Sequence, residues 1–284
     1  MTSNELARRP VTRPQFGSSC RNERPALVIA HPGHELRLFG WLCDARPDVF
    51  VLTDGSGHSG PPRIESTRRL LEGVGARPGS LFAAYTDQQV YRGLLNGNSS
   101  MFVYMATALI SSLRRGRYSM VVADPFEGYN PCHDLCSVLS NVAVRYVTST
   151  FGRTIRLFDY ALTGHSDLRS SESLITMRLS AEMLRRKRAA AQSYAELLNE
   201  VESAVRTEGE SAYGEEILRE LRLEEFPADA LSCPPFYERY GEQQRAAGRY
   251  ATIIRYADHF LPIAGTLSTL ARCSSAGRVQ RTAK

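Results

Sequence analysis

The stretch Ala26-Leu-Val-Ile-Ala-His-Pro-Gly-His-Glu35 decides how the rest of the chain is interpreted. It begins with a short, continuous apolar run, which is typical of a strand that is buried on both faces of a parallel sheet. A proline and a glycine follow among polar residues, and segment 35–43 then has the pattern of a helix. A buried strand that turns directly into a helix is the first half of a βαβ unit.

The same alternation continues on the carboxyl side of this stretch. Further strands are expected at 49–53, 81–85, 120–123 and 155–160, with helices at 64–73, at 100–114 and from about 134. Repeated strand–helix–strand units imply right-handed crossovers. We therefore predict an α/β fold with a doubly wound, mostly parallel sheet and helices on both of its faces.

The pattern changes after about residue 170. Apolar residues at helical spacing predict one long helix over 174–206 and a shorter one over about 214–222. We expect 223–248 to be irregular and 250–256 to form a late edge strand. The expected organisation is a disordered tail at 1–24, a single domain at 25–271 and a disordered basic tail at 272–284. Within that domain, residues 170–271 form a helical and irregular extension.

The net charge of +5 comes from the two ends of the chain. Residues 1–24 carry +3 and residues 272–284 carry +4, which leaves −2 on the remaining body. A nucleic-acid surface needs cations that follow the phosphates along a folded face. We therefore expect no nucleic-acid partner.

Other bulk features indicate an intracellular location. The sequence contains no apolar run of the roughly eighteen residues that a membrane span needs, and no leader pattern is recognisable. We therefore expect a cytoplasmic protein whose six cysteines are reduced thiols. Cys132 and Cys136 flank His133, but without a second pair they are better interpreted as small buried hydrophobes than as half of a metal site.

Three histidines occupy equivalent places in two strand-to-helix connections. His31 ends the first strand and His34 opens the following helix, while His133 opens the helix after the strand at 120–123. In open α/β sheets, ligands bind outside the carboxyl ends of strands where the strand order reverses. If the two strands are neighbours there, the three imidazoles can converge on one divalent ion, most simply Zn²⁺. Ordinary structural histidines are the alternative.

The two connections resemble the hallmark motifs of the PIG-L/LmbE-like de-N-acetylases, a family of zinc hydrolases on a Rossmann-like sheet. The family motif A-H-P-D-D-E corresponds to Ala30-His-Pro-Gly-His-Glu35, and the later H-x-x-H corresponds to Asn130-Pro-Cys-His133. The resemblance covers residues 25–200. It implies a small N-acylated substrate such as an amino-sugar conjugate, which is hydrolysed at the amide bond.

The resemblance also implies roles for individual residues and two departures from the family pattern. It implies that His31 and His133 are metal ligands, and that His34 replaces a ligand aspartate. Gly33 stands where the family has its general base, and Asn130 stands where the family has a histidine that assists the intermediate. Without a base near the reacting water, hydrolysis slows by about two to four orders of magnitude.

Nearby polar residues are candidates for the remaining roles. We expect Glu127 to be the substitute base, because it lies in the loop over the predicted site. Tyr129 is expected to be an oxyanion donor, with Asn130 as a second, and a packed loop tyrosine is the alternative for Tyr129. Asp124 and Asp134 are expected to orient imidazoles from behind. The loop after the second strand offers Asp54 and Gly55 for substrate binding, and a plain mobile turn is the alternative. Glu35 is either a substrate contact or a favourable charge in the first turn of its helix.

These expectations combine into one main hypothesis and two alternatives. The main hypothesis is a metal-dependent amidohydrolase that removes an acyl group from an amino-sugar or a similar small molecule. Because Gly33 removes the family base, the chain is alternatively a binding protein that keeps the pocket without the chemistry. The altered ligand set also leaves open the hydrolysis of a different amide or ester.

Overall fold

The computed structural model describes residues 24–57, 60–162, 174–197, 213–224, 231 and 233–279. Within these residues, seven strands form one sheet in the order β3-β2-β1-β4-β5-β7-β6. The strands are β1 Pro25–Ile29, β2 Asp48–Thr53, β3 Arg77–Tyr85, β4 Met120–Ala123, β5 Arg156–Tyr160, β6 Leu174–Arg178 and β7 Glu215–Leu221. Strands β1 to β5 are parallel, and β7 and β6 extend the sheet in antiparallel fashion.

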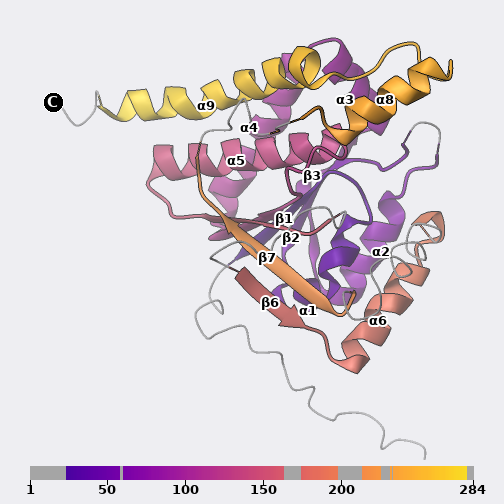
Figure 1. Ribbon diagram of the computed structural model, residues 1–284. Coiled ribbons are helices and arrows are strands. Elements are labelled where there is room, and N and C mark those ends of the chain that lie inside the picture. The colour runs from indigo at the N-terminus through magenta and orange to yellow at the C-terminus, as the bar shows by residue number, and fades with distance from the viewer. Residues whose placement is uncertain are drawn as a thin grey trace, which may run out of the picture.

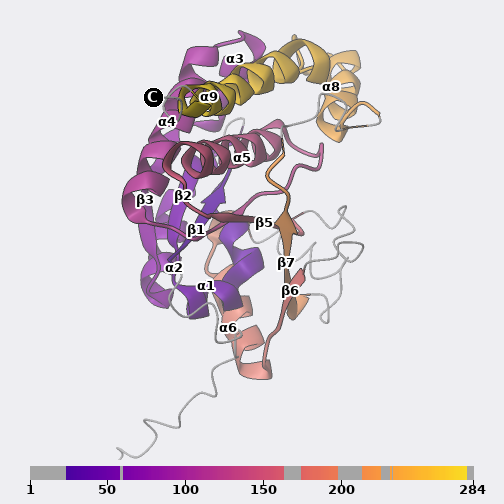
Figure 2. The same ribbon diagram turned by 90° about the vertical axis from the view of Figure 1, so that its left-hand side faces the viewer.

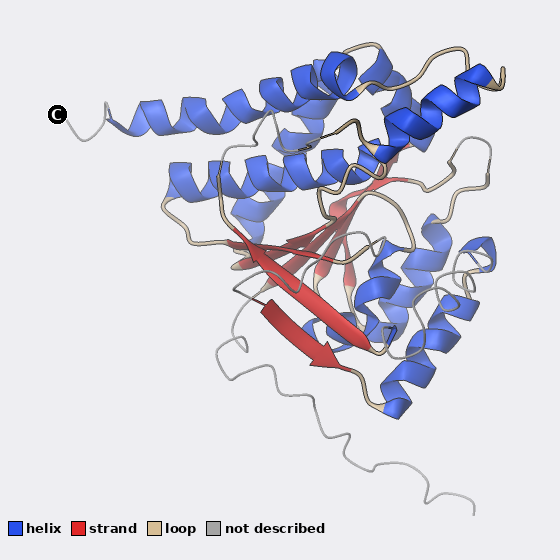
Figure 3. Cartoon of the chain, in the orientation of Figure 1, coloured by secondary structure: helices blue, strands red, loops and turns tan. Residues whose placement is uncertain are grey.

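Helices cover both faces of this sheet, as Figure 1 and Figure 3 show. One layer contains α3 Asp87–Leu95, α4 Ser99–Gly116, α5 Pro131–Phe151 and α9 Leu261–Val279. The opposite layer contains α1 Phe39–Ala45, α2 Ile64–Val74 and α6 Ala181–Gln192 (Figure 2). The remaining elements are α8 Phe236–Ala246 and three short helices, η2 His34–Leu38, η4 Ala195–Leu197 and η5 Tyr256–Phe260.

Strand β1 illustrates why the apolar runs become central strands. Its alternate side chains enter two separate cores: Val28 packs with the α4, α5 and α9 layer, and Leu27 and Ile29 pack with the α1, α2 and α6 layer. All three side chains are fully buried. A strand covered on both faces needs apolar residues at every position, which is the pattern seen at 26–30. The predicted α/β fold class is therefore confirmed.

The order of the strands fixes where a ligand can bind. From β1 the chain moves outward through β2 and β3, and it then returns to place β4 on the other side of β1. The strand order therefore reverses between β1 and β4, whose register pairs Val28 with Ala123. At such a switch point, the connections that leave the carboxyl ends of the two strands diverge and leave a crevice.

The prediction for 174–206 was wrong in its first part. Residues 174–178 form β6, and α6 begins only after Ser180, whose side chain accepts a hydrogen bond from the Met183 N–H. This N-cap separates strand from helix. The prediction also fails beyond Gln192, where α6 ends: Tyr194 precedes the short helix η4 and Leu197 is its last residue. Residues 198–206 lie outside the described residues.

The helix predicted at about 214–222 was also wrong, because these residues form β7. The segment is rich in Glu, Leu and Arg, which favour helices. Its burial alternates, however, with Glu216 and Leu218 turned inward, and it pairs with both β5 and β6. Pairing on two sides overrides the weaker local preference for helix.

Three smaller expectations also differ from the structure. The edge strand predicted at 250–256 is not a strand, because η5 begins at Tyr256 and leads into α9. Segment 223–248, expected to be irregular, contains α8. Helix α9 continues to Val279, into the segment where a disordered tail was predicted. Most of the predicted amino-terminal tail, 1–23, lies outside the described residues.

No helix among the described residues is both long and apolar enough to cross a membrane.

Candidate functional site

The predicted site residues gather at the switch point of the sheet. His31 lies just beyond the end of β1, and His34 is the first residue of η2. Asp124 directly follows β4, and its backbone N–H donates to the carbonyl of Val28 in the neighbouring strand. His133 lies in the first turn of α5. Two loops that are far apart in the sequence therefore meet above the carboxyl edge of the sheet.

The three imidazole rings lie close together. The ring centroid of His31 is 5.2 Å from that of His34 and 5.3 Å from that of His133. The centroids of His34 and His133 are 4.6 Å apart. All three pairs are close to edge-on, with interplanar angles of 88°, 65° and 89°. The rings thus surround a common space instead of stacking on one another.

Each ring contacts a carboxylate through its Nδ1 atom. His34 Nδ1 is 2.8 Å from Asp124 Oδ2, and His133 Nδ1 is 3.3 Å from Glu127 Oε1. The carboxylates are almost completely buried, since their side chains are 0% and 3% exposed. A carboxylate behind Nδ1 selects the tautomer in which Nε2 carries the lone pair, and it orients the ring.

The contacts of His31 define its tautomer in the same way. Its Nδ1 is 2.8 Å from Thr53 Oγ1 and 2.9 Å from Asp87 Oδ1. The hydroxyl proton of Thr53 is already donated to the carbonyl of Ala30, so the Thr53 oxygen can only accept from His31. His31 Nδ1 is therefore a donor, and Nε2 carries the lone pair. That buried Nε2 has no hydrogen-bond partner among the described residues.

Burial keeps His34 neutral. Burial lowers the pKa of His34 to about 4, although Asp124 opposes this shift. For Asp124 itself, burial raises the pKa, but its interactions with His34 and the hydrogen bond from Tyr160 lower it, and the net shift is downward. At neutral pH the pair is therefore a neutral imidazole that donates to an ionised carboxylate. A neutral imidazole is the form that binds a metal ion.

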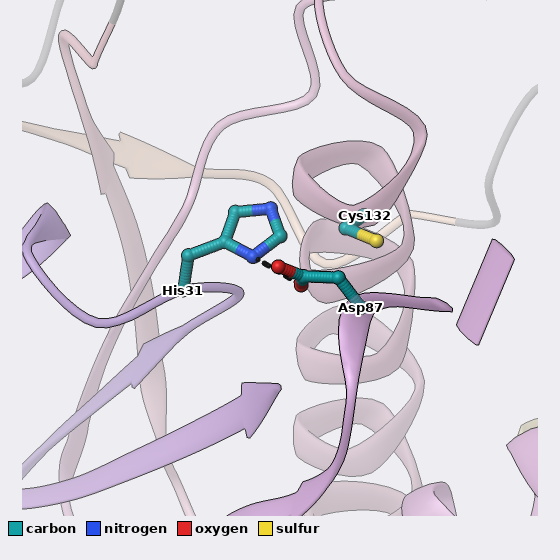
Figure 4. A group of neighbouring side chains, drawn as sticks. All are labelled: His31, Asp87 and Cys132. Atoms are coloured by element: carbon teal, nitrogen blue, oxygen red, sulfur yellow. Dashed lines mark ion pairs between the residues drawn. The ribbon is translucent and has the colours of Figure 1, made fainter. Parts of the chain in front are cut away.

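A second set of donor atoms lies beside His31. Among the described residues, His31, Asp87 and Cys132 form a group whose potential ligand atoms all lie within 4.8 Å of one another. Figure 4 shows the Asp87 carboxylate between the His31 ring and the Cys132 sulfur, with His31 Nδ1 turned toward Asp87. Burial raises the pKa of the Cys132 thiol well above its usual range, which disfavours the thiolate that metals bind.

The carboxylates singled out in the sequence occupy different positions. Asp124 accepts hydrogen bonds from the Ala30 N–H, from His34 and from the Tyr160 hydroxyl, at 2.7, 2.8 and 2.6 Å. Glu127 lies behind His133 and not over the open side of the rings. Asp134 Oδ1 accepts from the N–H groups of Glu127 and Gly128, both at 3.0 Å. Asp134 therefore holds the 124–131 loop and contacts no imidazole through these bonds.

Of the two expected oxyanion donors, Asn130 already makes hydrogen bonds within the protein. Asn130 is the N-cap of α5: its Oδ1 accepts from the Cys132 N–H at 2.8 Å, and its Nδ2 donates to the Tyr91 hydroxyl at 3.3 Å. Tyr129 is 37% exposed, and its ring centroid is 6.4 Å from that of His133. Of the two residues, only Tyr129 lies beside the histidines without a capping role.

The expected substrate contacts are mostly turned inward. Glu35 is fully buried; it accepts from the Tyr194 hydroxyl and from the Gly33 N–H, and burial raises its pKa. Asp54 Oδ1 accepts from the backbone and hydroxyl of Ser56. The carbonyl of Gly55 accepts from Arg63 Nε at 2.6 Å. These contacts favour structural roles for Glu35 and Asp54 over contact with a substrate.

Sequence reasoning missed Asp87, the carboxylate behind His31. It follows β3 at the same edge of the sheet, and Thr86 before it forms a capping box with Gln89 that starts α3. Its Oδ2 also accepts from the Gly57 N–H at 2.5 Å. The available signal was the Thr-Asp pair directly after an expected strand. The pattern of α3 itself went unrecognised, which hid that signal.

Likeness to known proteins is confined to the fold of the chain. No protein-family model matches it, and no curated protein gives a significant match. Solved structures with a similar fold include the zinc-inhibited form of teicoplanin deacetylase Orf2, with 14% identity and a TM-score of 0.47 over 70% of this chain and 98% of that one.

Two further matches are of the same kind. The A40926 pseudoaglycone deacetylase Dbv21 has 15% identity and a TM-score of 0.43 over 71% of this chain and 98% of its own. The conserved protein TT1542 from Thermus thermophilus has 17% identity and a TM-score of 0.44 over 74% and 99%. At these identities and TM-scores, the likenesses assign neither a family nor an activity to the chain.

Proposed function

We propose that the protein is a metal-dependent hydrolase that cleaves the amide bond of a small N-acylated molecule, with His31, His34 and His133 as the ligands of one divalent ion. The observation that carries this proposal is the shared arrangement of the three histidines. Each has a carboxylate behind Nδ1, which leaves the Nε2 atoms as the donors. Carboxylate–histidine pairs of this kind orient metal ligands in proteins.

The chemistry of the donor set fits zinc. Three neutral imidazoles with one exchangeable position is the arrangement of catalytic zinc sites. The buried, unpartnered Nε2 of His31 supports the same assignment, because a buried lone pair without a donor is unfavourable. When bound, such an ion lowers the pKa of water and polarises a carbonyl group.

Glu127 is the proposed proton acceptor. Three carboxylates contact the histidines, and Asp124 is fully buried with three donors around it. The hydrogen bond and charge of His31 lower the pKa of Asp87 against the effect of burial, which makes Asp87 a weaker base. Glu127, in the loop that leads to His133, is the remaining carboxylate of the three.

The alternative ligand set makes a different prediction. If His31, Asp87 and Cys132 held the ion, Asp87 would have to exchange its contact with His31 for the metal, and the Cys132 thiol would have to lose a proton that burial retains. We therefore favour the histidine set. Under that assignment Cys132→Ala leaves zinc affinity unchanged, whereas His133→Ala abolishes stoichiometric binding.

Hydrolysis is tested by measuring the release of acetate from a panel of N-acetylated amines, amino-sugars included, with zinc-loaded protein. Wild type is expected to be active, and His31→Ala and His133→Ala are expected to lose both metal and activity. Glu127→Gln retains the contact to His133 but accepts no proton, so it should keep zinc and lose about two to four orders of magnitude in kcat. The matched variant Asp87→Asn should weaken zinc binding about 10- to 100-fold instead.

Either of two results would refute the hydrolase proposal: no N-acetylated amine is turned over by the loaded protein, or activity survives in His31→Ala.

One observation favours a second candidate function. Gly33, whose φ is +106°, carries no carboxylate. The three carboxylates that contact the histidines do so at Nδ1, behind the rings and away from the Nε2 atoms. A protein that binds an N-acylated ligand without cleaving it would show this arrangement. Such a protein would bind members of the panel without releasing acetate.

A further inference from the structure

A pocket of about 680 Å³ opens beside the histidine cluster. It lies between α3, the 129–131 segment at the start of α5, α8 and the segment 249–254. Its lining includes Asn130, Tyr129 and Gly57, and Gly57 donates its N–H to Asp87 behind His31. The volume is that of a site for a whole small molecule and is far larger than an acetyl group requires.

The lining is unusually rich in exposed aromatic side chains. Six large hydrophobic residues of the described part of the chain are exposed, and four of them line this pocket: Tyr129, Phe236, Tyr240 and Tyr250. Exposed apolar surface that is concentrated in one concave site marks a binding surface.

Three of these rings form one continuous stack. The centroids of Tyr129 and Phe236 are 4.8 Å apart with an interplanar angle of 5°, and those of Phe236 and Tyr240 are 5.8 Å apart at 20°. Tyr129 extends this stack toward the metal site, since its centroid is 6.4 Å from that of His133. Because these near-parallel rings pack on one another, the stack presents ring edges and its outer faces to the pocket, and an aromatic ring in the ligand can pack against them.

The charged residues of the lining are of one sign. Arg92 and Arg249 line the pocket, and the described lining contains no Asp or Glu. A partly enclosed site with two guanidinium groups and no carboxylate attracts an anion. Tyr237 adds a further donor, because its buried hydroxyl has no partner among the described residues.

We propose that this pocket binds the amine side of the substrate, and that this side contains a planar aromatic group that carries a negative charge. The aromatic stack contacts the ring, and Arg92 and Arg249 contact the anionic group. The proposal rests on the proposed hydrolase function for the orientation of the substrate, because that function places the acyl group at the histidines. It identifies Phe236, Arg92 and Arg249 as residues that determine specificity.

The test uses ketone analogues in which CH₂ replaces the amide N–H, so that the acyl C–N bond that hydrolysis would break is absent. Three matched probes are compared by calorimetry on the zinc-loaded full chain: 4-(2-oxopropyl)benzoate, the neutral 4-(2-oxopropyl)benzamide and the saturated trans-4-(2-oxopropyl)cyclohexane-1-carboxylate. The methyl ketone is common to all three, so differences in Kd report on the pocket. The benzoate is expected to bind about tenfold more tightly than either of the others.

Variants separate the contribution of the two arginines from that of the aromatic stack. Arg92→Gln and Arg249→Gln should each weaken binding of the benzoate about threefold and leave the benzamide unchanged. Phe236→Ala should weaken both aromatic probes about fivefold and spare the cyclohexane acid. If Phe236→Ala does not fold, Phe236→Leu provides the same comparison. Tyr104→Ala and Arg178→Gln, exposed residues on α4 and β6 outside the pocket, are the controls and should change no Kd.

The outcomes distinguish this inference from the hydrolase proposal. Equal binding of the three probes, absence of binding, or the same Kd values in the pocket variants as in wild type would overturn the inference, whatever the result with N-acetylated amines. Tighter binding of N-acetylglucosamine than of the benzoate would overturn it in favour of a sugar. The expected ranking with no acetate release would support the pocket while refuting hydrolysis.

Discussion

Replacing His34 with asparagine should change how stability depends on pH, because the folded protein holds this histidine neutral. Burial lowers the pKa of His34 to about 4, against 6.5 in an exposed histidine. Between these values the unfolded chain binds a proton that the folded chain does not bind. The free energy of unfolding therefore falls as the pH drops from about 6.5 to 4.

The size of the effect follows from the shift of the pKa. A shift of about 2.5 units at 1.36 kcal/mol per unit gives a loss of about 3 kcal/mol over this pH range. The asparagine side chain can still donate to Asp124 but does not titrate. The variant His34→Asn should thus lack this loss, so that its stability relative to wild type improves by about 3 kcal/mol from pH 7 to pH 4.

Asp134 provides a control, because its effect on the free energy of unfolding changes with pH in the opposite direction to that of His34. Its pKa is raised from 3.8 to about 7, chiefly by burial. Here the folded chain binds the extra proton, so this group lowers stability as the pH rises from about 4 to 7. In Asp134→Asn that decline should disappear. Urea unfolding of the three proteins between pH 4 and 8, with a chelator present, measures both differences. If the difference between wild type and His34→Asn is the same at every pH, His34 is not held neutral and the reasoning fails.

Two further predictions concern Gly33 and the buried ion pair between Lys187 and Glu216. Gly33→Asp introduces the aspartate of the motif that this segment resembles. It should lower stability by about 2 kcal/mol without raising hydrolysis, because Gly33 has a φ of +106° and an added Cβ would lie 2.3 Å from Leu197 Cδ1. Thermal unfolding and an acetate-release assay measure the two effects, and a gain in activity would contradict the prediction. Lys187→Met should cost about 3 to 5 kcal/mol, because it leaves the buried carboxylate of Glu216 without the cation that lies 2.8 Å away. Urea unfolding checks this value, and a double variant with Glu216→Gln that is no more stable than Lys187→Met would argue against the pair.

The central sheet could be predicted from the sequence because its strands are buried on both faces. The expected bounds of the strands at 26–30, 49–53, 120–123 and 155–160 agree with β1, β2, β4 and β5 to within one residue. The antiparallel extension was missed for a physical reason. Its strand β7 consists of residues with a helical preference, and only the pairing with β5 and β6 makes it a strand.

For the candidate site, sequence patterns located the histidines but not everything that orients them. The switch-point rule placed His31, His34 and His133 at one edge of the sheet, and their ring centroids lie within 5.3 Å of one another. Asp124 Oδ2 lies 2.8 Å from His34 Nδ1, and its role in orienting that ring stays a prediction. Which carboxylate lies behind which ring depends on side-chain directions in loops. Such directions are not encoded in a local pattern, and Asp87 was therefore overlooked.

The most direct test of the account is X-ray absorption at the zinc edge, measured on the zinc-loaded protein. Three imidazole ligands at His31, His34 and His133 predict one zinc per chain, nitrogen scatterers at about 2.0–2.1 Å with the outer-shell pattern of three rings, and no sulfur shell. The same spectrum should be obtained from Cys132→Ala. A sulfur shell at about 2.3 Å, or fewer than two imidazoles, would contradict the histidine site and the hydrolase proposal that depends on it.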